Sequence, residues 1–317
     1  MLAAIWGASY MFIAIGLRDL DPVMIAFLRI ALAALVLAPF AASRRAFAGL
    51  RERLAILVLL GAVQAAGPWV LLALGQQEVS SSLAGILVAS TPIFAALLAI
   101  RFDREERAEG LRLVGVGVGI GGVVVLLGLD LGGSSAALLG GLAIVLASLG
   151  YAIGGFMVKH RFGPVQPIGI AAGVMLASTI LLAPAAAFYL PAEMPAIGPV
   201  AAVAALGVVG TGIAFVIFYE LMTTVGPART FVVTYLAPAF AVVYGAALLD
   251  EEITVATIAG LALIVGGSYL AAEGRLPWAR PPSRPPAGAV PPPPGGEAAA
   301  QPGIALRPSP SEAGRER

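Results

Sequence analysis

The stretch Leu54–Gly75 of this chain, LAILVLLGAVQAAGPWVLLALG, decides its fold class. It contains no charged side chain, and Arg51 and Arg53 stand just before it. A helix needs about 20 apolar residues to cross the hydrocarbon core of a bilayer, which is close to the length of this stretch. We therefore expect a membrane-spanning helix here, with the primary amide of Gln64 near its centre.

Segments of the same kind recur along the whole chain of 317 residues. The segments expected to span the membrane are 2–17, 23–41, 54–75, 83–100, 111–129, 138–158, 167–189, 198–219, 230–249 and 255–272. Hydrophobic residues make up 59% of the chain, charged residues 12%, and the mean hydropathy is +0.95, whereas a soluble protein of this size needs more polar surface. The segments also lack the alternating pattern of an outer-membrane barrel. The sequence therefore predicts an all-α polytopic membrane protein with ten transmembrane helices.

The basic residues indicate which side of the membrane each gap between segments faces. With the N-terminus inside, the even-numbered gaps and the C-terminal tail contain 17 of the 19 Lys and Arg residues. These are Arg44, Arg45, Arg51, Arg53, Arg101, Arg104, Arg107, Arg112, Lys159, Arg161, Arg229 and six arginines from Arg275 to Arg317. The odd-numbered gaps contain Arg18, and Arg29 lies inside the second segment. Because cytoplasmic loops are enriched in Lys and Arg, both termini are expected to be cytoplasmic.

The two halves of the chain match each other at an offset of about 145 residues. The matches are Trp6-Gly7 with Tyr151-Ala152, Leu60-Gly61 with Leu206-Gly207, Val79 and Pro92 with Val225 and Pro238, and Gly115, Gly121 and Gly122 with Gly260, Gly266 and Gly267. A repeat of five helices is odd in number, so its second copy must enter the membrane from the opposite side, as in many transporters. We expect one five-helix repeat at 1–132 and an inverted five-helix repeat at 133–273.

The two ends of the chain differ from its middle. The first apolar segment has no basic residues before it and no convincing cleavage site, so a retained helix is expected instead of a signal peptide. At the other end, residues 274–317 hold half of the 24 prolines, which predicts a disordered, proline-rich cytoplasmic tail. A ligand for an adaptor domain is an alternative role for this tail.

Five groups of residues resemble the EamA-type branch of the drug/metabolite transporter superfamily. They are IWGASY at Ile5–Tyr10, the pair Leu28-Arg29, GPAR at Gly226–Arg229, YLAP at Tyr235–Pro238 and LDEE at Leu249–Glu252. The resemblance covers about 1–272 and implies a ten-helix carrier of the bacterial inner membrane. It also implies a small metabolite as substrate, commonly an amino acid or a related compound, and often export. The family often has a Lys eight residues after the Trp; this sequence has Ala14 there, and Lys159 at the matching place in the second half.

Polar side chains near the centres of the apolar segments are the candidate substrate ligands, because polar groups are costly in hydrocarbon. They are Ser9, Tyr10, Gln64, Ser90, Thr91, Ser148 and Thr211. Gln64 is the strongest candidate, since its amide has four hydrogen-bonding sites to satisfy. Trp6 and Tyr151, at matching places in the two halves, are expected to line the pathway, while Trp69 either lines it or belongs to an interfacial belt. The alternative for the hydroxyls is a structural bond to a backbone carbonyl or to a neighbouring helix.

Four residues are candidates for gating. Pro92 and Pro238 lie at matching places in two segments, where each removes a backbone hydrogen bond and kinks its helix. Arg29 lies inside the second segment, where it either snorkels to the membrane interface or pairs with Glu251 or Glu78 in one state of a gate. The alternative for Glu251 is a structural role at a helix end.

The coupling mechanism is suggested by what the segments lack. No Asp or Glu stands at the centre of a segment, so a buried proton-carrying carboxylate of the common kind is not expected. Movement of substrate down its gradient is the first expectation, with Na⁺ held by backbone carbonyls as an alternative. The chain has no cysteine, and neither a metal nor a cofactor is expected.

Three other functions compete with a carrier for a small polar or amphipathic metabolite. A membrane enzyme needs a cluster of catalytic groups, whereas the single histidine, His160, lies in a basic gap. A scaffold or sensor would act through the tail, and a nucleotide-sugar carrier would need several basic side chains in its cavity. The net charge of +1 says little about partners, so a small molecule and the bilayer are expected, without nucleic acid.

Overall fold

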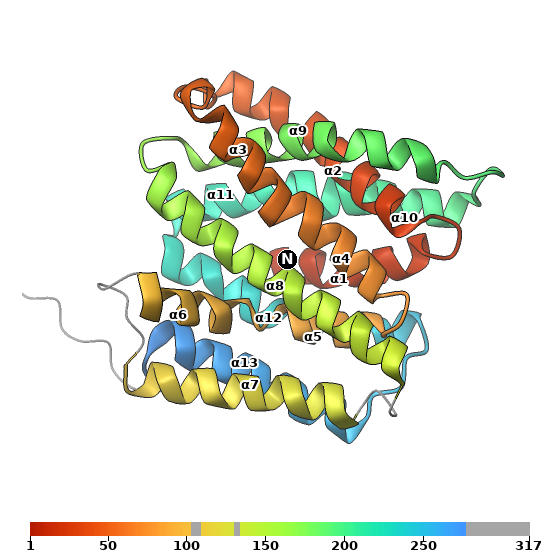
Figure 1. Ribbon diagram of the computed structural model, residues 1–317, viewed down its shortest axis with the longest axis vertical. Coiled ribbons are helices and arrows are strands. Elements are labelled where there is room, and N and C mark those ends of the chain that lie inside the picture. Colours follow the sequence, from red (N-terminus) through yellow and green to blue (C-terminus); the bar gives the residue numbers. More distant parts are fainter. Residues whose placement is uncertain (103–108, 130–133, 277–317) are drawn as a thin grey trace, which may run out of the picture. The chain divides into compact units, whose positions relative to one another are not determined.

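The computed structural model describes residues 1–102, 109–129 and 134–276 (Figure 1). Within these ranges every regular element is a helix and none is a strand, so the predicted all-α class is confirmed. The described helices form one unit, Met1–Leu276. Nearly all of the tail predicted at 274–317 lies outside the described residues.

Most of the predicted segments form one helix each, and three consist of consecutive pieces. The single helices are α1 (Leu2–Gly16), α2 (Pro22–Ser43), α7 (Leu111–Leu129), α8 (Ser135–Arg161), α9 (Pro167–Ala186), α12 (Pro227–Leu248) and α13 (Val255–Glu273). The pieces are α3 (Leu54–Gly61), η2 (Ala62–Ala66) and α4 (Gly67–Gly75), then α5 (Ser81–Val88) and α6 (Thr91–Phe102), then α10 (Ile197–Gly207), η4 (Val208–Ile213) and α11 (Ala214–Thr224). Two short 3₁₀ turns, η1 (Arg51–Arg53) and η3 (Ala187–Tyr189), precede α3 and follow α9.

Eight of the described helical segments are long and apolar enough to cross a membrane. Two further apolar helices, Leu2–Gly16 and Val232–Leu248, are shorter. Large apolar side chains remain uncovered on the outer faces, such as Leu35 with 71% exposure and Ile180 with 74%. Faces of this kind suit contact with lipid, so the structure supports a multispanning membrane protein.

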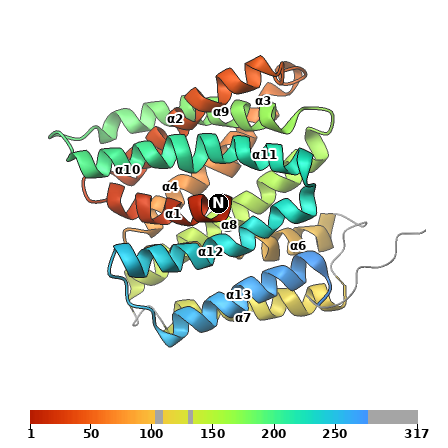
Figure 2. The same ribbon diagram turned by 180° about the vertical axis from the view of Figure 1, so that it is seen from behind.

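The long helices lie side by side, with α2, α3 and α9 at one edge of the bundle and α7 and α13 at the other (Figures 1 and 2). Glycines allow the α7–α13 pair to approach closely. A Cβ on Gly115 would lie 2.7 Å from the carbonyl oxygen of Gly267, and a Cβ on Gly267 would lie 2.4 Å from the amide nitrogen of Gly119. Gly117 and Gly121, on the other face of α7, meet open space instead. The α7–α13 contact thus uses one glycine face of α7 for helix packing, as small residues do in membranes.

Several helix ends have side-chain partners for their free backbone groups. The Asp21 carboxylate accepts a hydrogen bond from the amide nitrogen of Val23 at the start of α2, at 2.8 Å. Thr254 and Thr257 form a capping box at the start of α13, and Gly274, with a φ of +66°, ends that helix. Such partners matter because the first and last turns of a helix leave backbone groups unpaired.

The buried apolar side chains form two large clusters. One lies between α2, α3, α4 and α9 and contains the fully buried Leu60. The other involves α1, α5, α8 and α10 and contains the fully buried Ile144. Trp69 belongs to the first cluster and Tyr151 packs against it. Tyr10 packs against the second cluster. These three aromatic residues therefore pack against the apolar core.

Candidate functional site

Two transmembrane segments contain a short π-helical turn near their middle. One is η2, between α3 and α4, and the other is η4, between α10 and α11. A π-turn inserts a residue into an α-helix, changes the direction of nearby side chains and often occurs at functional sites. Gln64 lies in η2 and Thr211 lies in η4, so both π-turns carry a residue predicted as a substrate ligand.

Thr211 connects η4 to α2. Its hydroxyl is fully buried and donates to the carbonyl oxygen of Leu206, five residues earlier, at 2.9 Å. The same oxygen accepts a hydrogen bond from Nε of Arg29 at 3.0 Å. A threonine predicted as a ligand therefore holds a buried arginine in place.

Arg29 points into the protein interior. Its exposed fraction is 9%, and its Cζ atom lies 3.9 Å from the ring centroid of Trp69, which places the guanidinium in cation–π contact with the indole. The snorkelling alternative for Arg29 is therefore wrong, since its guanidinium is enclosed by protein. Trp69 has an exposed fraction of 5%, so it occupies the interior and not an interfacial belt.

Two tyrosines complete this site. Tyr10 in α1 and Tyr151 in α8 both lie within electrostatic range of the Arg29 guanidinium, and Tyr151 also lies near Trp69. We call Tyr10, Arg29, Trp69, Tyr151 and Thr211 the Arg29 cluster. Its members come from α1, α2, α4, α8 and η4, and all but Trp69 were expected to contact substrate or form a gate. Trp69 was harder to assign, because a tryptophan in an apolar segment suits either an interior site or a belt.

Gln64 is half-buried against α8. A Cβ on Gly154 would lie 2.6 Å from the Gln64 Cβ, so this glycine leaves the room that the glutamine fills. Its amide forms no hydrogen bond with the described part of the chain. Ser9 shows the opposite situation: it packs against Gly210 of η4, and its hydroxyl bonds back to the Ile5 carbonyl at 3.4 Å.

Pro92 divides the fourth predicted segment into α5 and α6. Proline has no N–H for the carbonyl four residues earlier, which belongs to Val88. The Thr91 hydroxyl donates to this carbonyl at 2.8 Å, so it has a structural partner in place of a substrate. Pro238 is buried within the continuous helix α12, so the two matched prolines differ in their local structure. Their gating role stays a prediction.

Three more hydroxyls pair with carbonyls beside this helix break. Ser90 and Ser148 both donate to the carbonyl of Leu87, at 2.6 and 3.3 Å. Ser268 of α13 donates to the carbonyl of Ala89 at 2.6 Å. In lipid, backbone groups must find partners within the protein, and these hydroxyls supply them. In this structure Ser90 and Ser148 therefore follow the structural alternative.

Trp6 of α1 packs against aromatic side chains of α11. Its ring centroid lies 5.3 Å from that of Phe218 and 6.3 Å from that of Phe215. Phe215 in turn stacks on Tyr219 at 6.1 Å. Trp6 is half-buried, and the expected lining role of its side chain stays a prediction.

Glu251 closes the N-terminal end of α5. Its carboxylate accepts hydrogen bonds from the amide nitrogens of Ser81 and Ser82, at 2.7 and 2.9 Å, and from the Ser82 hydroxyl at 2.5 Å. A carboxylate at this place satisfies free N–H groups and interacts favourably with the helix dipole. The expected ion pair of Arg29 with Glu251 or Glu78 is therefore not formed in this structure, because Arg29 bonds to Thr211, Glu251 bonds to α5, and Glu78 is exposed.

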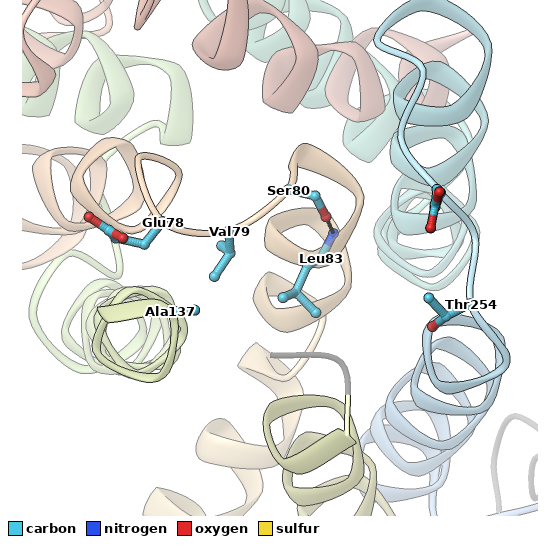
Figure 3. Close-up of a pocket in the computed structure, with 7 residues that line it drawn as sticks. Glu78, Val79, Ser80, Leu83, Ala137 and Thr254 are labelled. Atoms are coloured by element: carbon cyan, nitrogen blue, oxygen red, sulfur yellow. Dashed lines mark hydrogen bonds between the residues drawn. The ribbon is translucent and has the colours of Figure 1, made fainter. Parts of the chain in front are cut away.

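A pocket of about 330 Å³ lies beside this end of α5 (Figure 3). It is lined by Glu78, Val79, Ser80, Leu83, Ala137, Glu252 and Thr254. A second pocket of about 240 Å³ lies beside η2 and has a mainly apolar lining that includes Val63, Pro68 and Gly150. Neither lining contains a member of the Arg29 cluster, so these two pockets are separate from the cluster.

The described helices and the Arg29 cluster together define a polytopic α-helical membrane protein with a polar site inside its bundle. The chain belongs to the EamA-like transporter family, whose sequence model matches residues 1–128 and 138–272. The family resemblance of the sequence is thereby confirmed.

Several relatives are themselves named as transporters. The uncharacterized inner membrane transporter YedA of Escherichia coli is 28% identical over 280 residues, which cover 86% of this chain and 89% of YedA. The uncharacterized transporter YoaV of Bacillus subtilis is 25% identical over 272 residues, covering 84% of this chain and 92% of YoaV. A probable amino-acid metabolite efflux pump of Escherichia coli is 25% identical, covering 85% of this chain and 92% of the pump.

The fold also matches a solved crystal structure. That protein is 21% identical and superposes with a TM-score of 0.62, covering 86% of this chain and 95% of the other. The family and its named relatives give this chain a general transporter function in a membrane, without implying catalysis.

Proposed function

We propose that this protein exports a small polar or amphipathic metabolite of amino-acid type across the bacterial inner membrane by alternating access. The Arg29 cluster carries this proposal, because a buried arginine that bonds to Thr211 and stacks on Trp69, with two tyrosines in electrostatic range, lies inside the bundle of a transporter-family protein. Polar and ionisable side chains within a membrane are costly and commonly mark a substrate path. The name of one relative, a probable amino-acid metabolite efflux pump, supports the substrate class and the direction.

Alternating access in this proposal depends on ten helices in two inverted repeats, 1–132 and 133–273. The π-turns support the repeat, since η2 begins at Ala62 and η4 begins at Val208, 146 positions later. No feature of the apolar pattern requires a π-turn in both segments. A duplicated five-helix unit explains their common placement.

Aromatic pairs support the same relation between the halves. Trp6 and Tyr151 occupy matching positions, and so do Phe215 and Trp69. The ring centroids of Trp6 and Phe215 lie 6.3 Å apart, and Tyr151 lies near Trp69. The Trp6–Phe215 pair and the Tyr151–Trp69 pair therefore occupy matching positions, with one residue of each pair in each half. Exchanged contacts of this kind are expected from a two-fold relation.

Glycine contacts are a third observation that supports the relation between the two halves. A Cβ on Gly61 would lie 3.4 Å from the carbonyl oxygen of Val174, and a Cβ on Gly207 would lie 3.1 Å from the carbonyl oxygen of Arg29. Gly207 follows Gly61 by 146 positions, and Val174 follows Arg29 by 145. The end of α3 in the first half therefore packs on α9 of the second half, and the end of α10 in the second half packs on α2 of the first half.

The proposed transport is movement down the substrate gradient. The buried polar side chains among the described residues include no Asp or Glu, which leaves this part of the interior without a carboxylate to carry protons. In the proposed orientation both termini are cytoplasmic, as the distribution of Lys and Arg favours.

Counterflow in proteoliposomes tests the proposed function. The purified protein should accelerate exchange of at least one radiolabelled compound from a panel of amino acids and related metabolites. Gln64→Ala should slow this exchange roughly 3- to 10-fold, the effect of losing one or two neutral hydrogen bonds. Gln77→Ala, at an exposed glutamine outside the helices, is the matched control and should leave it unchanged. If no compound of a broad panel moves, the transport proposal is refuted; normal exchange by Gln64→Ala would remove Gln64 from the site.

A further inference from the structure

We propose that Arg29 binds the carboxylate of the transported compound, which makes the substrate a small monocarboxylate with an apolar or aromatic body. This inference rests on the proposed transport function and specifies the chemistry of its site. It replaces a gating ion pair as the role of Arg29.

The guanidinium of Arg29 has donors that the protein does not use. It carries five N–H groups, of which the one on Nε donates to Thr211 at 3.0 Å. Its two Nη groups have no hydrogen bond or ion pair with the described residues. A buried charge is costly unless an opposite charge and hydrogen bonds compensate it. An anion bound to the Nη groups would therefore stabilise this side chain, which is 9% exposed.

The contacts of Arg29 leave one edge of the guanidinium available. Trp69 covers a face of the planar group, with its ring centroid 3.9 Å from Cζ, and Thr211 occupies Nε. The edge formed by Nη1 and Nη2 remains. Two parallel N–H groups on one edge match the two oxygens of a carboxylate, which is the geometry that distinguishes arginine from lysine.

The charge at this site favours one negative group. Arg29 is the one charged residue among the buried side chains that the structure describes. The other members of its cluster are a threonine, a tryptophan and two tyrosines, which are neutral. A carboxylate balances a single guanidinium, whereas the diphosphate of a nucleotide sugar would bring more negative charge than this site compensates.

The surroundings of Arg29 also specify the rest of the substrate. Trp69 is buried, while Tyr10 and Tyr151 are half-buried beside the guanidinium. Ligand sites combine apolar and aromatic walls with a few polar groups that fix orientation. The Trp69 ring on the guanidinium, with two tyrosines in electrostatic range, fits a compound with an apolar side chain and a terminal carboxylate.

Fluorescence of Trp69 provides a binding assay that does not require transport. The chain has three tryptophans, so Trp278→Phe leaves Trp6 and Trp69, and Trp69→Phe in that background identifies the emission that comes from Trp69. The probes are L-leucine, L-phenylalanine and 4-methylpentanoate, each compared with its primary amide, which has the same body without the negative charge. The acids should change Trp69 emission saturably, and the amides should bind at least about 10-fold more weakly.

Substitution of Arg29 is the second arm of the test. In the same background, Arg29→Met should weaken binding of the acids roughly 10- to 100-fold, and Arg29→Lys should restore part of it, because lysine keeps the charge without the two-pronged edge. Arg18→Met removes an exposed arginine by the same substitution and should bind as the parent does. If Arg29→Met does not fold, the difference in affinity between acids and amides, measured on the protein with Arg29 intact, still tests the carboxylate site.

The outcomes separate this inference from the transport proposal. Equal binding of acids and amides, full binding by Arg29→Met, or no emission change with any acid overturns the carboxylate site. Selective binding of acids without counterflow of any compound supports the carboxylate site and refutes transport. Counterflow that is as fast for amides as for acids supports transport and overturns the site.

Discussion

Glu251→Ala is expected to loosen the start of α5 more than any other change of an acidic side chain described above. The Glu251 carboxylate accepts hydrogen bonds from two backbone N–H groups and one hydroxyl at that helix end. The residues that donate them, Ser81 and Ser82, are only 1% and 3% exposed. Water therefore replaces the lost oxygens poorly after the substitution.

The expected cost follows from these three contacts. A hydrogen bond to a charged group contributes about 1.5–3 kcal/mol, and a carboxylate at a helix N-terminus adds about 0.3–1 kcal/mol. The contributions are not additive, and Glu251 itself is partly exposed, so we expect a loss of about 2–4 kcal/mol in the free energy of unfolding. For a chain of this size that loss corresponds to a fall in Tm of roughly 4–8 °C.

Thermal unfolding of the purified protein in detergent measures the fall in Tm. Hydrogen–deuterium exchange of peptides from Ser80–Val88 shows whether the loosening occurs at the start of α5. Glu252→Ala is the matched control, because Glu252 is the exposed neighbour and should change stability by less than about 0.5 kcal/mol. Glu251→Gln should lie between parent and Glu251→Ala, since its amide keeps one acceptor oxygen. Equal falls in Tm for Glu251→Ala and Glu252→Ala, with unchanged exchange at α5, would refute the capping role.

Two further predictions concern helix packing and orientation. Gly267→Val should destabilise the α7–α13 pair by about 1–3 kcal/mol or more, because its Cβ would meet the Gly119 backbone at 2.4 Å, while Gly266→Val faces open space and should be tolerated in the same thermal assay. Comparable melting of the two variants would contradict the close approach of α7 and α13. Reporter domains fused after Arg45 and after Glu193 should report opposite sides of the membrane, and agreement between them would contradict the ten-helix orientation.

The fold class could be predicted from the sequence because a bilayer requires long apolar helices. Leu54–Gly75 has the necessary length and lacks charge, and the structure places helices on it and on the other predicted segments. The π-turns within two of these segments were not predicted. Ala62–Ala66 and Val208–Ile213 are made of small and apolar residues that suit an α-helix equally well, so the local composition carries little signal for the extra residue.

The candidate site could be predicted in part. Tyr10 and Thr211 are recognisable as polar groups near segment centres, and Tyr151 by its match with Trp6. The structure bonds Thr211 to Arg29 and places both tyrosines within electrostatic range of it. Ser90 and Ser148 have the same signature in the sequence, yet their hydroxyls bond to the Leu87 carbonyl. A hydroxyl can serve the backbone or a ligand, and the choice depends on which carbonyls a helix break leaves unpaired, which the sequence does not specify.

The hydroxyl of Thr211 donates its single proton to the backbone carbonyl of Leu206. What it presents to the interior is therefore lone-pair density, which attracts a positive group and repels a negative one. An anion approaching Arg29 is kept away from the threonine side and meets the opposite edge of the arginine. The Leu206 carbonyl, which lies just before the π-turn that contains Thr211, thus orients the threonine hydroxyl and with it the side from which an anion can approach Arg29.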